Sequence, residues 1–130
     1  MHKNILTLSV ILFAIACSPV SEWNSPSDNE ALEVFEDLDI DLLSLPLFER
    51  IKVFEGLKAK NIEFWASLNK TEFEGLLRIF KVEGDYDDFY EFSSIVESKI
   101  DPDYPYLMKI EVTINEDLYE IYGIGIKSYD

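Results

Sequence analysis

The stretch that decides the fold runs from Tyr106 to Ile114 and reads YLMKIEVTI. Apolar residues recur at every second position, and most residues between them are polar, which is the period of a β-strand. A short polar loop, NED, follows at 115–117, and apolar residues resume from Leu118 to Tyr129. The pattern predicts an antiparallel β-hairpin that closes the domain and packs on other elements, because an isolated hairpin is only marginally stable.

Ahead of this hairpin the apolar residues have the spacing of amphipathic helices. Capping boxes, in which Ser or Thr is followed three residues later by Glu, start at Ser27 and Thr71. We therefore expect an α+β domain, with about four or five short helices followed by the C-terminal antiparallel β-hairpin. The expected helical stretches are 28–44, 46–58, 62–68, 71–80 and 85–100.

The first residues of the chain have the pattern of a secretory signal peptide. A polar start with one lysine precedes twelve residues, Ile5 to Ala16, of which ten are apolar. A helix of twelve residues spans roughly 18 Å, which is short of the ~30 Å hydrocarbon core of a bilayer. The stretch therefore suits a cleaved leader, residues 1–16, better than a permanent transmembrane helix.

The only cysteine of the chain ends this pattern, in the sequence Ala14-Ile15-Ala16-Cys17. This motif resembles the lipobox of bacterial lipoproteins, with Ala14 where that class most often has Leu. The resemblance is confined to residues 1–17 and implies cleavage between Ala16 and Cys17, a diacylglycerol on the Cys17 thiol and a membrane anchor in the bacterial cell envelope. Ser18 after the cysteine favours the outer over the inner membrane. Ordinary signal peptidase, which recognises Ala-x-Ala, would cut at the same bond and leave a secreted protein.

The residues after the cysteine are rich in Ser, Pro and Asn, a composition that buries little apolar area. We expect residues 17–29 to form a lipidated N-terminus and flexible tether, and residues 30–130 to form a single folded domain.

Catalytic chemistry is poorly supported by the sequence. The one histidine, His2, lies in the leader, and Cys17 would carry lipid. The mature chain therefore has no histidine base for Ser-His or Cys-His catalysis and no free His or Cys ligand for zinc. We expect no enzyme, no cofactor and no metal site, with a weak Ca²⁺ site in Asp85–Asp88 and a small carboxylate-dependent hydrolase as alternatives. The glycines of Gly123-Ile124-Gly125 lie in an expected strand and indicate a bulge or a close backbone approach.

The net charge of −15, from 26 acidic and 11 basic residues, argues against nucleic acid as a partner. Eight acids and no base occur from 28 to 49, whereas seven bases against four acids give 50–81 a charge of +3. All seven tyrosines lie at or after Tyr86. Acidic residues and tyrosines together predict a surface for a basic protein. Its expected members are Tyr86, Asp87, Asp88, Tyr90, Asp101, Asp103 and Tyr104.

These features favour a lipid-anchored, acidic envelope protein with a non-catalytic, accessory or structural role. The alternative is a binding module, such as an inhibitor or immunity protein, that uses the acidic, Tyr-rich face against a basic partner.

Overall fold

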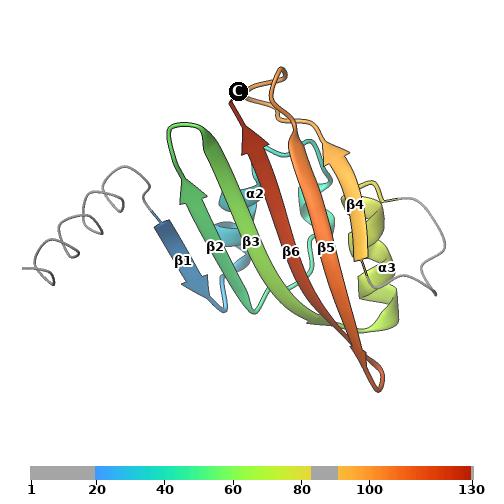
Figure 1. Ribbon diagram of the computed structural model, residues 1–130. Coiled ribbons are helices and arrows are strands. Elements are labelled where there is room, and N and C mark those ends of the chain that lie inside the picture. The colour runs from blue at the N-terminus through green and yellow to red at the C-terminus, as the bar shows by residue number, and fades with distance from the viewer. Residues whose placement is uncertain (1–19, 83–90, 130) are drawn as a thin grey trace, which may run out of the picture.

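The computed structural model describes residues 20–82 and 91–129, and these form one antiparallel sheet with two α-helices (Figure 1). The strand order is β1-β2-β3-β6-β5-β4. The strands are β1 (Val20–Asn24), β2 (Arg50–Glu55), β3 (Ala59–Leu68), β4 (Glu91–Val96), β5 (Tyr106–Asn115) and β6 (Leu118–Ser128). The helices are α2 (Asp28–Phe35), a 3-10 helix η1 (Leu42–Ser44) and α3 (Lys70–Ile79). Both α-helices lie behind the sheet in Figure 1, so they cover one face, and no described element covers the other, open face.

The expected series of four or five helices before a hairpin is wrong. Segment 46–58 contains β2, segment 62–68 lies within β3, and the described part of 85–100 contains β4. The helix expected at 28–44 ends at Phe35, and only η1 follows it in that range. The C-terminal hairpin is confirmed as β5 and β6, which pair in register from Tyr106 opposite Lys127 to Asn115 opposite Leu118.

The two α-helices begin at capping boxes. Ser27 caps α2 with Glu30, as the sequence predicted, and Asn69 caps α3 with Glu72. The α3 cap thus lies two residues before the expected Thr71, because the Asn69-x-x-Glu72 pattern overlaps the Thr71-x-x-Glu74 pattern. Val20–Asn24, in the segment expected to be a tether, form β1 and pair with β2 at the edge of the sheet.

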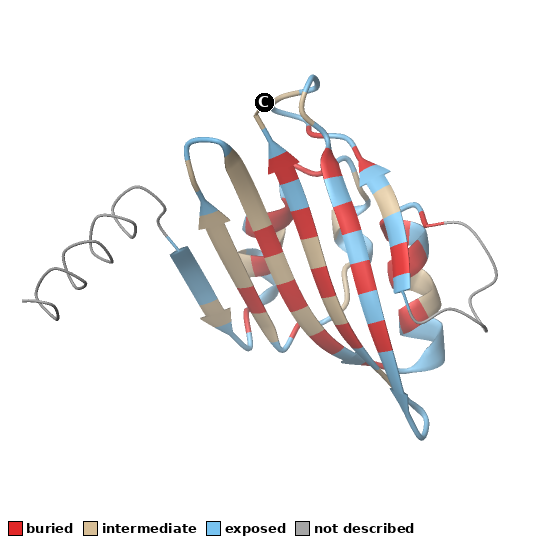
Figure 2. Ribbon diagram, viewed as in Figure 1, coloured by how far each residue is buried: buried red, intermediate tan, exposed pale blue. Residues whose placement is uncertain are grey.

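Buried residues alternate with more accessible ones along the central strands (Figure 2). In β5 the even-numbered residues from Tyr106 to Val112 are buried and the odd-numbered residues between them are exposed. The same alternation in β3 buries Ile62, Phe64 and Leu68. The sheet therefore has one apolar face, which the helices cover.

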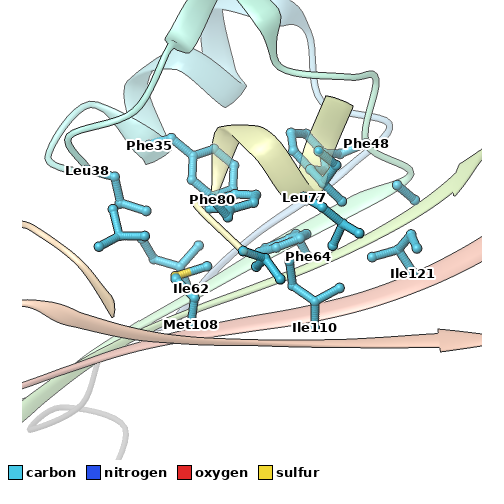
Figure 3. Close-up of a cluster of buried hydrophobic side chains, with 14 of the residues drawn as sticks. Phe35, Leu38, Phe48, Ile62, Phe64, Leu77, Phe80, Met108, Ile110 and Ile121 are labelled. Carbon is cyan, nitrogen blue, oxygen red and sulfur yellow. The ribbon is translucent and has the colours of Figure 1, made fainter. Parts of the chain in front are cut away.

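The centre of the core is a cluster of four phenylalanines between the helices and the sheet (Figure 3). Phe35 of α2, Phe48, Phe64 of β3 and Phe80 have neighbouring ring centroids 5.3–6.1 Å apart. Gly123 of β6 is the register partner of Phe64, and a Cβ atom at Gly123 would lie 2.0 Å from Phe64 Cζ. The close backbone approach that the glycine pair indicated is confirmed, since only glycine leaves room for this ring.

Candidate functional site

A groove of about 190 Å³ lies between α2 and the segment that contains η1. Six of its seven described lining residues are apolar, and Leu43 is the most exposed of these six, with 92% of its surface accessible. By contrast, Leu42 and Leu45 also pack against the hydrophobic core. The described lining residues are Asp28, Ala31, Leu32, Leu42, Leu43, Leu45 and Pro46.

Both walls of this groove are held by side-chain caps. At α2 the Glu30 N–H donates to Ser27 Oγ at 3.2 Å, and the Ser27 N–H donates to Glu30 Oε1 at 2.9 Å. At η1 the Leu43 N–H donates to Asp41 Oδ1 at 3.1 Å, and Ser44 Oγ donates to Asp41 Oδ2 at 2.7 Å. These caps satisfy backbone N–H groups that a helix start leaves unpaired, so they fix where each wall begins.

The chain that forms the walls of the groove is acidic. Six carboxylates besides the buried Asp37 lie on α2 and the chain that follows it to η1, and all six are exposed except Glu30, which is half-buried. Among them Asp39 forms an exposed ion pair with Lys81 at 3.7 Å. An apolar groove with an acidic rim can accept an apolar side chain flanked by cations. The six are Asp28, Glu30, Glu33, Glu36, Asp39 and Asp41.

The groove does not have the carboxylate pair that the hydrolase alternative requires. Of the seven described residues that line it, only Asp28 is acidic. A second hollow, of about 360 Å³, lies between η1 and α3 and contains Asp41 beside the cation of Arg78. General acid–base hydrolysis of a glycoside needs two carboxyl groups across one cleft. The described residues that line these two hollows supply one carboxyl group each, Asp28 and Asp41, and not such a pair.

A buried polar cluster lies at one end of the covered face. The Asp37 carboxylate accepts from Lys127 Nζ at 2.7 Å, from Tyr106 Oη at 2.9 Å, from Ser98 Oγ at 2.7 Å and from the Ile100 N–H at 2.8 Å. Asp37 and Lys127 are only 4% and 2% exposed. The cluster joins the chain after α2 to the start of β5, the end of β6 and the loop before β5.

The charges of this cluster stabilise each other. Burial alone would raise the pKa of Asp37, but the hydrogen bonds from Lys127, Ile100, Ser98 and Tyr106 outweigh it and hold that pKa well below 3.8. Burial would lower the pKa of Lys127, and its bonds to Asp37 and Asp101 raise it instead. Every group of the cluster already has a protein partner, so its arrangement is that of a structural link between segments.

The middle of the open face carries a second polar and aromatic group. Arg50 Nε donates to Glu22 Oε1 at 2.6 Å, and the guanidinium lies 4.6 Å from the centroid of Trp65. Trp65 packs on Tyr122 with centroids 5.2 Å apart, and Tyr122 Oη donates to Glu63 Oε2 at 2.8 Å. Burial and the Glu63 carboxylate raise the pKa of Tyr122 to about 12. These contacts link β1, β2, β3 and β6 across the open side.

The structure places part of the predicted acidic, Tyr-rich surface. Asp101, Asp103 and Tyr104 lie together in the loop between β4 and β5. Asp101 accepts from Lys127 Nζ at 3.0 Å, Asp103 is exposed, and the Tyr104 ring meets Tyr129 edge-on at 5.6 Å. Asp101 therefore takes part in the buried cluster. The other members, Tyr86, Asp87, Asp88 and Tyr90, lie outside the described residues, as do Asp85 of the expected Ca²⁺ site and the lipobox residues Ala16 and Cys17.

The groove and the buried cluster were not among the sequence predictions. One signal for the cluster was available, because Lys127 continues the inward-facing series of Ile121, Gly123 and Gly125 in β6. A lysine at a core-facing position requires a buried acid as partner. The groove exists because the chain turns back after Phe35. A helix that continued through residue 44, as the sequence predicted, would have no such turn and no groove.

Within residues 20–82 and 91–129 no helix has the length and apolar character needed to cross a membrane. The same residues contain no group of three or more acidic, histidine or cysteine side chains placed to hold a metal ion. The chain matches no protein-family model, no curated protein and no solved structure.

Proposed function

We propose that this chain is a lipid-anchored, non-catalytic accessory protein of the bacterial cell envelope that holds a basic polypeptide in the groove beside α2. The observation that carries the proposal is the apolar groove of about 190 Å³ with an acidic rim. An apolar anchor residue would enter beside Leu43, and flanking Lys or Arg residues would face the carboxylates of α2.

Sequence features support the non-catalytic and anchored parts of this proposal. The mature chain would have no histidine, and its only thiol would be the lipid-bearing Cys17. Several acyl chains on one residue hold a protein stably on a membrane, because each buried methylene contributes about 0.8 kcal/mol.

The anchor is tested by Cys17→Ala in a bacterial host. We expect the variant to leave the membrane fraction and to lose the mass of the lipid. A variant that keeps both its membrane association and its mass would contradict the anchor.

The groove is tested with two matched variants of the full chain in detergent, Leu43→Ser and Leu57→Ser. Both leucines are highly exposed, at 92% and 87%, but only Leu43 lines the groove. The probe is a synthetic amphipathic peptide of leucine and lysine. We expect Leu43→Ser to weaken binding about tenfold, because burying a leucine contributes about 1.5–3 kcal/mol. Binding should also weaken with added salt.

Equal affinity loss in the two variants, or none in either, would contradict the groove. The natural partner is then sought by placing a photoreactive residue at position 43 or 57 of the anchored protein in its own envelope. We expect a cross-link to a basic polypeptide from position 43 and no cross-link to that polypeptide from position 57. A neutral or acidic product would argue against this class of partner.

A further inference from the structure

The chain enters the sheet beside the tip of the β2–β3 hairpin (Figure 1). Val20 begins β1 and is the register partner of Phe54, two residues before the turn that starts at Gly56. Three residue steps separate Cys17 from Val20 in the sequence, and a chain spans at most about 3.6 Å per residue. A lipid on Cys17 would therefore lie within about 11 Å of Val20, close to the hairpin tip.

This hairpin is the cationic part of an acidic protein. Between residues 50 and 60 there are four bases and one acid, Glu55, in a chain whose net charge is −15. Lys58 is exposed and Lys52 and Lys60 are half-buried, while Arg50 pairs with Glu22. In contrast, the surface of α2 on the covered side carries acids alone. The hairpin tip and the surface of α2 thus differ in the sign of their charge.

Apolar side chains are exposed at the same end of the sheet. Leu57 at the hairpin tip is 87% exposed. One row of register partners crosses the open face through all six strands, and five of its six members are apolar. Each of the five is exposed or half-buried. The row is Val20, Phe54, Asn61, Ile126, Leu107 and Ile95.

We propose that this corner, the hairpin tip with the apolar row beside it, lies against an anionic lipid bilayer next to the lipid on Cys17. The inference rests on the anchor in the proposed function. A single anchor point lets a domain rotate, whereas an added patch of lysines and apolar side chains supplies a second contact with anionic lipid. The acids of α2 are repelled by the same surface. The groove beside α2 therefore points away from the membrane, toward a partner in solution.

The test is a depth measurement on the lipidated full chain in vesicles. A fluorophore is attached at Leu57→Cys or, as the control, at Asp117→Cys in the turn at the opposite end of the sheet; the Cys17 thiol is blocked by its lipid. The vesicles contain phosphatidylcholine with or without phosphatidylglycerol, and one lipid carries a quencher. We expect quenching about threefold stronger at position 57 than at 117 in anionic vesicles, since side chains in the interface reach the acyl boundary.

The charge contribution is tested with Lys58→Gln/Lys60→Gln against Lys70→Gln/Arg78→Gln, which removes the same charge from α3 on the covered side. We expect the first pair to abolish the extra quenching in anionic vesicles and the second to leave it unchanged. Equal quenching at 57 and 117 on a chain whose mass includes the lipid would overturn the orientation while leaving the anchor intact. A chain whose mass lacks the lipid would overturn the anchor and the orientation with it.

Discussion

The covered face of the sheet has two regions that are stabilised in different ways. In its middle, Phe64 contacts the rings of Phe35, Phe48 and Phe80, and nothing there depends on a particular partner atom. At its end, Asp37 and Lys127 are equally buried but depend on each other. Burial alone therefore does not determine how much a substitution lowers the stability of the fold. In the middle the loss should depend on the side-chain volume that is removed. At the end it should depend on whether a charged partner remains buried without its counter-ion.

The largest effect is expected in the middle, from Phe64→Ala. Removing a fully buried ring deletes apolar contacts and leaves a cavity, which costs about 3–5 kcal/mol of unfolding free energy. Urea unfolding of the mature chain measures it. The matched control is Phe54→Ala, the same change at a half-buried position on the open face, and a similar loss there would show that the two faces are equally important.

At the polar end, we expect Lys127→Met to cost about 3 kcal/mol, because it leaves the Asp37 carboxylate buried without its cation. The double variant Asp37→Asn/Lys127→Met removes the charge of both partners and keeps an acceptor for Tyr106 and Ser98. It should therefore unfold at a higher urea concentration than Lys127→Met alone. If the double variant is the less stable of the two, the loss comes from packing, and the contrast with the middle disappears.

The polar end should also make stability depend on pH. Because the pKa of Asp37 is lowered by folding, its contribution is fully present above the ordinary value of 3.8 and is lost as the pH falls toward the folded-state pKa. The stability difference between the unmodified chain and Asp37→Asn should thus be constant near neutral pH and shrink below 3.8. Thermal unfolding at a series of pH values measures it.

The smallest effect is expected from Tyr106→Phe, which removes one donor to Asp37 and keeps the ring. The carboxylate retains Lys127, Ser98 and the Ile100 N–H, so the loss should be about 1 kcal/mol. Tyr104→Phe is the control, because its contact with Tyr129 is between rings and survives the change. A loss above that of Lys127→Met would mean that the hydroxyl, and not the ammonium, is the main partner of Asp37.

The sequence could predict the C-terminal hairpin because β5 alternates strictly, with polar residues such as Lys109 and Glu111 on the open side. It could not separate strand from helix in β4, since Phe92 and Val96 share a face in either structure when four residues apart. In β3, Trp65 lies on the open face and interrupts the alternation, so Ile62, Trp65 and Leu68 imitate a helical stripe. The strands were missed where apolar residues occur on both faces.

The candidate site was harder to predict than the fold for a related reason. Leu42 follows Leu38 at a spacing of four residues, which extends a helical pattern, yet the chain leaves the helix after Phe35. The isolated pairing of Leu38 with Ser98, together with the buried carboxylate of Asp37, draws this segment toward the loop before β5. Contacts with residues some sixty positions away thus set a local shape, and no local pattern contains that information.

The position of β6 has a consequence for the timing of folding. It is the last of the six strands in sequence, yet it lies between β3 and β5 and joins the two halves of the sheet. A chain that emerges from a ribosome or an export channel N-terminus first cannot complete its sheet until this strand is released. Pairing between segments so far apart in the sequence is slow, because the entropy cost of closing the loop comes before the contacts that offset it. Until β6 arrives, β1, β2 and β3 on one side and β4 and β5 on the other have no strand to connect them.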